Sequence, residues 1–255
     1  MNSVPYLDPA RERPRIRPFK AMAHMRKLIA DKEDTEQVFH IIDALNGDHI
    51  VRELDAFAAS EAGRARIRER RYLPPLLDDH DALRRLPEGS VGRAYVDFME
   101  REGLTAQGLV DESDKFFKQT HGDLVEWFGH RKRDTHDLFH VLSGYGRDAL
   151  GEASLLAFTH GQSGGGRGVI FIAWMGCRQI RKAVPRDIDI MACFREGRRN
   201  GKAARRILAE DVMALLEEPL EAARARLAIA EPVAYKKALA EISRLGEPRE
   251  TLAAA

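Results

Sequence analysis

The residues best suited to chemistry lie within seventeen positions of the sequence. His136 and His140 are four residues apart, Asp137 follows the first of them directly, and Glu152 comes twelve residues after the second. Side chains four apart on a helix share one face, so both imidazoles can bind one ion. Two imidazoles with two carboxylates are a ligand set for a divalent metal. We therefore predict a metal site formed by these four residues.

The fourth ligand depends on a turn of the chain. Glu152 can reach the two histidines only if the chain doubles back at residues 143–146, where two glycines favour a turn. Imidazoles and carboxylates suit zinc, but they also suit iron(II) and manganese. The ligand types alone leave these three metals open, and zinc is the cofactor that we expect first.

A purely structural interpretation of the same residues is also open. Asp134 could cap a helix, with Asp137 at the third helical position reaching back to the cap, and both histidines could be ordinary residues near a core. However, Phe139 and its apolar neighbours draw this helix inward, where buried imidazoles and carboxylates need partners to offset desolvation. A shared metal would satisfy all of them together.

The segment around these residues resembles a known family. The motif HDLFH, eleven intervening residues and then Glu152, inside RDTHDLFHVLSGYGRDALGE, is similar to the HDxxH…E signature of the Coq4 family of ubiquinone biosynthesis proteins, bacterial branch. The resemblance extends over most of the chain, through LIADKEDTEQVFHIIDALNG, FTHGQ and REGRRNGKAARRILAEDVMALLEEPLEAARARLAI. It implies an all-α protein, a homodimer, and a metal held by His136, Asp137, His140 and Glu152.

Composition excludes several classes of protein. The 255 residues are 44% hydrophobic and 32% charged with a net charge of +1, which indicates a globular protein without a global field for nucleic acid. The two cysteines form no CxxC pair, which argues against a disulfide framework or a thiolate zinc site. No apolar signal segment follows the basic N-terminus, and the longest apolar run, residues 169–175, is too short to cross a bilayer.

Proline and arginine content divides the chain into parts. We predict a flexible basic arm over residues 1–18, one all-α multi-helix domain over 19–245, and a C-terminal tail over 246–255. Within the domain, Asp34 and Gln37 resemble a capping box at the start of a helix. Apolar periodicity predicts further helices over residues 48–60, 91–102, 124–130, 134–142, 151–158, 169–182, 187–196, 202–217 and 220–229.

Two other motifs resemble active sites of known enzyme classes. Gly161-Gln162-Ser163-Gly164-Gly165 fits G-x-S-x-G, but the last histidine is His160, so the order of a hydrolase triad cannot be built. A connection between two helices is the better interpretation of these glycines. His121 and His130 would fit an HD-type phosphohydrolase, although the compact HxxxH and glutamate pattern favours one site without them.

Two features could contact a substrate. Arg133, in the basic run 131–133, could pair with a substrate carboxylate at the mouth of the metal site, or the run could simply face solvent. A hydrophobic groove between helices could hold an isoprenoid tail, although most of its candidate residues also suit a core. These candidates are Phe116, Phe117, Trp127, Phe128, Phe139, Leu142, Leu155, Leu156, Phe158 and Phe171.

The resemblance implies two alternative functions. The first is a carboxy-lyase that removes the C1 carboxylate of a polyprenylated methoxy-hydroxybenzoate, with or without oxidation at the same carbon, using His136, Asp137, His140, Glu152 and Arg133. The second is a lipid-binding organiser of ubiquinone biosynthesis enzymes with a structural metal. In either case we expect a cytoplasmic protein at the inner face of the cell membrane, with the ring intermediate and other enzymes of the pathway as partners and no nucleic acid.

Overall fold

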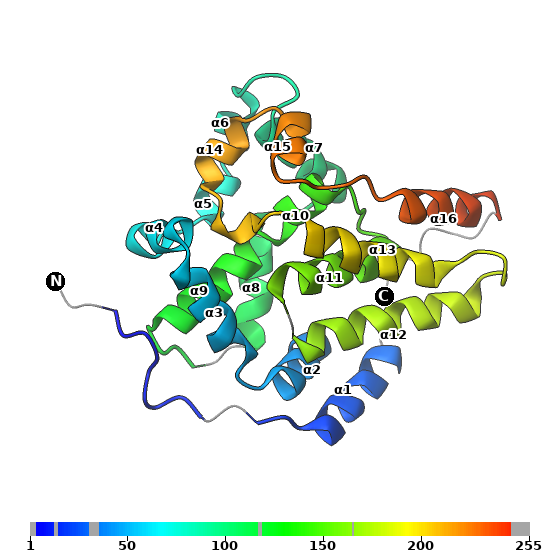
Figure 1. The fold of residues 1–255 in the computed structure, drawn as a ribbon, viewed down its shortest axis with the longest axis horizontal. Helices are drawn as coiled ribbons and strands as arrows, with labels where there is room; N and C mark the ends of the chain where they lie inside the picture. The colour runs from blue at the N-terminus through cyan, green and yellow to red at the C-terminus, as the bar shows by residue number, and fades with distance from the viewer. Residues whose placement is uncertain (1–3, 13–14, 31–35, 117–118, 165, 246–255) are drawn as a thin grey trace. The chain divides into compact units, whose positions relative to one another are not determined.

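The chain is built from helices (Figure 1). The computed structural model describes residues 4–12, 15–30, 36–116, 119–164 and 166–245, and no β-strand occurs among them. This confirms the predicted all-α fold. Within these residues, no helix has both the length and the apolar character that spanning a membrane requires.

The contacts divide the chain into two compact units. The first unit comprises the described residues of Met1–Arg15, Gly47–Val141 and Arg206–Ala223, and the second those of Ile16–Asn46, Leu142–Arg205 and Arg224–Ala255. Each unit therefore combines segments that are distant in sequence. The prediction of a single domain between two tails is not tested by this division, and the predicted tail 246–255 lies outside the described residues.

The first unit contains mostly short helices. Among them are the helix that carries the HxxxH motif and the helix directly before it. A core of Leu54, Phe57, Leu124, Val125 and Phe128 joins α3 to α9. The helices of this unit are α3 (His49–Ala59), α4 (Glu61–Glu69), α5 (Pro74–Leu77), α6 (His80–Arg84), α7 (Val91–Glu102), α8 (Ala106–Phe116), α9 (Leu124–Asp134), α10 (His136–Ser143), the 3₁₀ helix η1 (Ile207–Ala209), α14 (Val212–Glu217) and α15 (Leu220–Arg226). Helices α10 and α15 continue past the unit's boundaries.

The second unit contains the longest helices. The helices that lie wholly within it are α1 (Pro18–Ala30), α2 (Glu36–Asn46), α11 (Ala149–Ser163), α12 (Arg167–Ala183), α13 (Ile190–Ala203) and α16 (Val233–Arg244), of which α1, α11, α12 and α13 are the longest among the described residues. Helix α11 packs against both α12 and α13, and α12 also packs against α2 (Figure 1). The buried core residues Ala21, Met25, Ile41, Ala44 and Ile172 join α1, α2 and α12.

Glycines allow α11 and α13 to approach very closely. A Cβ atom added at Gly197 would lie 2.4 Å from the carbonyl oxygen of Ser154, and one at Gly201 would lie 2.0 Å from that of Phe158. A Cβ atom at Gly161, on α11, would lie 2.5 Å from the carbonyl oxygen of Arg198. Because real Cβ atoms do not come so close to backbone oxygens, only glycine permits this crossing.

Helix boundaries mostly follow the predicted apolar periodicity, with one clear exception. The helix predicted over 202–217 is wrong, because α13 ends at Ala203 and α14 begins only at Val212. Ala204 is extended, and the N–H of Arg205 donates to the carbonyl of Leu227 at 2.8 Å. This non-helical bond turns the chain away after α13, and the sequence pattern contains no sign of it.

Several local predictions can be compared with the structure. Asp34 lies outside the described residues, and Oε1 of Gln37 is 2.6 Å from Nδ1 of His24. The predicted connection between helices is mostly wrong for the G-x-S-x-G segment: Gly161, Gln162 and Ser163 form the end of α11, and of the segment's described residues only Gly164 follows it, capping the helix with a positive φ of 71°. The cysteines are buried and unbridged, consistent with the absence of a disulfide framework.

The N-terminal arm binds the start of α9. Arg11 donates to the carboxylate of Asp123 from Nε at 2.5 Å and from Nη2 at 2.8 Å. The N–H of Asp8 donates to the same carboxylate at 2.8 Å, and the N–H of Leu124 donates to the carbonyl of Pro5 at 3.0 Å. Asp123 also caps α9, since it accepts the N–H of Glu126 at 2.8 Å. These contacts fix a part of the arm that was expected to be flexible.

Candidate metal centre

A break between two helices sets the position of the HxxxH motif. Helix α9 ends at Asp134, the hydroxyl of Thr135 donates to the carbonyl of Arg131 at 2.8 Å, and α10 begins at His136. Asp134 therefore ends one helix and does not cap the next, so that part of the structural interpretation is wrong. Oδ1 of Asp134 instead accepts a hydrogen bond from Nε of Arg133 at 2.8 Å.

Three of the four predicted ligands form one cluster in the first unit. One ligand atom each from His136, Asp137 and His140 lies within 4.8 Å of the others. The two imidazole rings meet edge to face, with their centroids 5.0 Å apart, as expected for neighbours one helical turn apart. His140 is 1% exposed and Asp137 is 7% exposed, whereas His136 is half-buried. The prediction of a shared helix face is confirmed.

Helix α7 supplies the surroundings of this cluster. The ring of Phe98 stacks on that of His140 with centroids 5.3 Å apart, and the guanidinium of Arg101 lies 5.4 Å from the ring centroid of Phe98. Tyr95, one turn earlier on α7, is fully buried. Burial raises the pKa of the Tyr95 hydroxyl, and the carboxylates of Asp137, Asp78 and Asp134 raise it further. Apart from the apolar periodicity of α7, no sequence pattern predicts these neighbours.

The donor set fits a divalent metal ion. Around a tetrahedral zinc ion the ligand atoms stand about 3.3 Å apart, so small side-chain rotations would bring the three donors onto one ion. A divalent ion bound by two neutral imidazoles and one carboxylate forms a complex with a net charge of +1. At least one coordination position then stays open for another ligand. Burial of Asp137 and His140 would also strengthen their attraction to a cation, because the local dielectric constant is low.

Glu152 belongs to the second unit, in the first turn of α11. Its Oε1 lies 3.6 Å from Nε of Arg147. Asp148 caps this helix, because Oδ1 accepts the N–H groups of Leu150 at 3.2 Å and Gly151 at 3.1 Å. The role of Glu152 as a fourth ligand stays a prediction.

The basic run 131–133 is bound within the protein rather than facing solvent. Arg131 donates to the carbonyls of Leu208 and Glu210 at 2.8 and 2.7 Å, and Lys132 pairs with Glu53. Burial lowers the pKa of Arg131 to about 10. Arg133 donates to Asp134 and, at 2.7 Å, to the hydroxyl of Ser113. A substrate contact by Arg133 therefore stays a prediction, and it would require the guanidinium to exchange one of these partners.

The other histidines lie outside the cluster. His121 precedes α9, with Nδ1 2.7 Å from Oδ2 of Asp8, and His130 faces Glu126 with an exposed ring. Neither belongs to a group of potential metal ligands among the described residues. The arrangement therefore does not support the phosphohydrolase interpretation.

Most candidates for a hydrophobic groove are core residues. Phe128, Phe139, Leu142, Leu155 and Phe158 are buried. Trp127 packs against the core of the first unit, and Leu156 and Phe171 pack against that of the second. The side chains of Phe116 and Phe117 lie outside the described part of the chain. The groove therefore stays a prediction.

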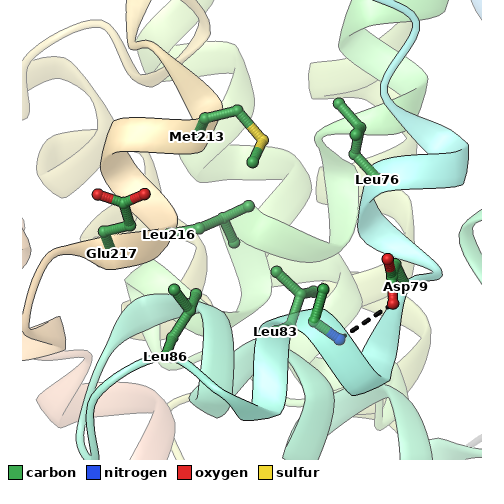
Figure 2. Close-up of a pocket in the computed structure, with 8 residues that line it drawn as sticks. Leu76, Asp79, Leu83, Leu86, Met213, Leu216 and Glu217 are labelled. Atoms are coloured by element: carbon green, nitrogen blue, oxygen red, sulfur yellow. Dashed lines mark hydrogen bonds between the residues drawn. The ribbon is translucent and has the colours of Figure 1, made fainter.

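A small apolar pocket of the first unit has a different lining (Figure 2). It has a volume of about 150 Å³, well below the roughly 300–1,000 Å³ of typical ligand pockets. Figure 2 shows leucine and methionine side chains pointing into it from α5, α6 and α14, with Asp79 bound to the N–H of Ala82 at its edge. The lining residues are Leu76, Asp79, Ala82, Leu83, Leu86, Met213, Leu216 and Glu217. None of the predicted site residues lines this pocket.

Sequence comparisons connect most of the chain with one family. The profile of the family described as "Coenzyme Q (ubiquinone) biosynthesis protein Coq4" matches residues 19–232. The mitochondrial ubiquinone biosynthesis protein COQ4 of Pyricularia oryzae is 32% identical over 104 residues, and that of Scheffersomyces stipitis is 26% identical over 173. These alignments cover 41% and 67% of this chain. They span 33% and 51% of the fungal proteins, so the match is to a third to a half of the relatives' length.

A solved structure has the same fold. A crystal structure of a candidate ubiquinone biosynthesis protein from Nostoc punctiforme PCC 73102 superposes with a TM-score of 0.65. The superposition covers 85% of this chain and 100% of that one, at 22% sequence identity. At this identity the likeness shows the fold and leaves the chemistry to be argued from the side chains.

Proposed function

The chain belongs to the Coq4 family of coenzyme Q (ubiquinone) biosynthesis proteins, and from that premise we propose that it is a metal-dependent carboxy-lyase of this pathway. Its substrate would be a polyprenylated methoxy-hydroxybenzoate, which loses the carboxylate at C1. The observation that carries the proposal is the grouping of His136, Asp137 and His140 within 4.8 Å on α10. Glu152 is the proposed fourth ligand.

The proposed decarboxylation requires stabilisation of negative charge. When the C1–carboxylate bond breaks, its electron pair stays on the ring carbon, carbon dioxide leaves and the ring carbon takes up a proton. A bound divalent ion supplies a Lewis acid that can stabilise charge on a substrate oxygen. Zinc suits this role; iron(II) or manganese would also fit the donors, and iron(II) would allow dioxygen to serve as the oxidant of an oxidative variant.

The chain's own residues have defined tasks in this proposal. His136, Asp137 and His140 hold the ion, and Phe98 covers the His140 ring and keeps water from it. Arg133, if released from Ser113, would pair with the carboxylate of the substrate.

The burial of Asp137 and His140 favours a second candidate function. A site closed by four protein ligands is typical of structural zinc. The protein would then be a lipid-binding organiser that holds the hydrophobic intermediate and gathers other enzymes of the pathway. Glu152→Gln separates the two functions: catalysis requires that turnover is lost while the fold is kept, whereas a structural metal requires that unfolding accompanies metal loss.

The experiment is mass-spectrometric detection of product from a short-chain prenylated methoxy-hydroxybenzoate, with and without oxygen. The metal-loaded full chain should remove the carboxyl group, His140→Ala should not, and His130→Ala on α9 should behave like the unchanged protein. Dependence on oxygen would distinguish oxidative from simple decarboxylation. Absence of turnover by folded, metal-loaded protein would contradict the enzymatic function.

A membrane surface, a homodimer and a cytoplasmic location belong to the same proposal. They are inferred from the polyprenyl substrate, which partitions into lipid, and from the family. The basic helix α4 is one candidate contact, although Arg66 on it is bound to Glu69 and Asp211, both at 2.8 Å. Flotation with anionic liposomes at low and high salt would test membrane binding, and no binding at either salt would contradict it.

A further inference from the structure

The hydroxyl of Tyr95 is a buried polar group that calls for a partner. Tyr95 lies on α7 and is 0% exposed. Among the residues that the structure describes, none forms a hydrogen bond with its hydroxyl. A buried hydroxyl without a partner lowers stability, and most such groups in proteins are satisfied. A partner for the Tyr95 hydroxyl would have to be a nearby acceptor that another state of the protein presents.

Helix packing places Tyr95 beside the metal-binding helix. Tyr95 and Phe98 are three residues apart on α7 and share one face. Phe98 stacks on His140, so this face of α7 lies against α10. Asp137 is one turn before His140 on α10. Of the carboxylates that raise the pKa of Tyr95, Asp137 has the largest effect, which agrees with this placement.

The other nearby carboxylates already have donors. Oδ1 and Oδ2 of Asp78 accept the N–H groups of Ala106 and Gln107 at 2.6 and 2.9 Å, at the start of α8. Asp134 accepts from Arg133 at 2.8 Å. Of the three carboxylates, only that of the candidate ligand Asp137 belongs to the helix that Phe98 contacts, which favours it as the acceptor for Tyr95.

We propose that Tyr95 is a positioning residue of the metal site, whose hydroxyl donates a hydrogen bond to Asp137 when the metal is bound. The acceptor would be the Asp137 oxygen that does not bind the ion. Carboxylate ligands of metals are commonly held by outer hydrogen bonds of this kind, which fix the orientation of the ligand. The inference rests on the proposed metal site and adds to it a residue from α7, forty-one positions before the HxxxH motif.

The first test is the zinc affinity of the full chain, measured by competition with a chelator. Tyr95→Phe removes only the hydroxyl and should raise the zinc dissociation constant about 10- to 100-fold, the typical effect of losing an outer partner. Tyr72→Phe is the matched control, because it removes a hydroxyl from a tyrosine of the same unit that is 53% exposed. The control should bind zinc like the unchanged protein.

Two further measurements separate this role from a contribution to folding. Urea unfolding of the metal-free protein should show that Tyr95→Phe is no less stable than the unchanged chain, since the lost hydroxyl had no partner among the described residues. The visible absorption of the cobalt(II)-loaded protein should change in Tyr95→Phe, because the orientation of a ligand changes. A merely structural tyrosine would alter stability and leave the cobalt spectrum unchanged.

A double-mutant cycle tests whether Tyr95 acts through Asp137. In an Asp137→Ala background, Tyr95→Phe should cause no further loss of zinc affinity. The inference is overturned if Tyr95→Phe alone stays within about twofold of the unchanged affinity, or if its loss persists in full without Asp137. If the unchanged chain binds no zinc, the proposed metal site fails and the inference fails with it; if it binds zinc and only Tyr95→Phe shows no effect, the metal site stands.

Discussion

Asp123 at the start of α9 and Asp137 in the first turn of α10 are carboxylates of the same unit with similar burial, at 2% and 7% exposed. Asp123 accepts two backbone N–H groups and two N–H groups of the single Arg11 guanidinium, all from its own chain. Asp137 instead stands in a cluster with His136 and His140. The first carboxylate is satisfied by the fold itself, and the second is placed where a cation would complete its surroundings.

The surroundings of the two carboxylates distinguish a structural from a functional buried charge. Burial disfavours the charged form of Asp123, but Arg11 and the N–H groups outweigh it and lower the pKa of this carboxyl to about 2. Such a group stabilises the fold without any added ligand. For Asp137 the neighbouring donors are imidazoles, which bind metals as well as protons. A substitution of Asp123 should therefore change stability, whereas a substitution at the Asp137 site should change metal binding.

The largest expected effect is on metal binding at the Asp137 site. Zinc held by four ligands is bound by about 10–16 kcal/mol, so one ligand is worth about 3 kcal/mol, on the order of a hundredfold in affinity. His140→Ala should lose about this much zinc affinity. His130→Ala, a change on α9 with a 43% exposed side chain, should lose none. Equal zinc affinities of the two variants in a chelator competition would contradict the metal-binding role of the Asp137 site.

A smaller effect, on stability alone, is expected at Asp123. Because its folded pKa of about 2 is below the ordinary value of 3.8, its stabilisation is complete above about pH 4 and is lost as the pH falls toward 2. Asp123→Asn should therefore lower the free energy of unfolding at pH 7 by about 2 kcal/mol and flatten its decrease between pH 4 and 2.

Urea unfolding at several pH values measures this effect, and zinc affinity is the control. The variant should bind zinc as the unchanged chain does. A variant that is equally stable at pH 7, or that binds zinc more weakly, would show that the two carboxylates do not have separate roles.

The smallest effect concerns the arm. Arg11→Ala should cost about 1 kcal/mol, because the Arg11 side chain is 26% exposed and the N–H donors to Asp123 remain. Arg15→Ala, at an exposed position of the same chain segment, is the matched control and should cost close to nothing. Unfolding free energies at low salt would reveal the difference. Identical unfolding free energies of the two variants would mean that the arm does not stabilise the buried carboxylate of Asp123.

Local periodicity predicted the parts of the structure that depend on a few neighbouring residues. The spacing of His136 and His140 is sufficient to place both on one helix face, whatever the rest of the chain does. Helix α7 also has the predicted bounds, residues 91–102.

Contacts between distant segments could not be predicted in this way. The stacking of Phe98 on His140 and the bonds from Arg131 to Leu208 and Glu210 join positions 42 or more residues apart. Nothing in the local pattern of either segment specifies the other. The same holds for the end of α13, where the bond from Arg205 to Leu227 overrides a continuous helical periodicity.

The glycine crossing of α11 and α13 has a consequence for how this chain can change over generations. Gly161, Gly197 and Gly201 each face backbone atoms, which cannot rotate out of the way as side chains can. A single methyl group added at any of them would clash with the backbone of the facing helix, so the two helices would have to move apart there. Substitutions in this part of the molecule are therefore confined to positions that face away from the crossing. The distance between the two helices stays the same as the sequence changes.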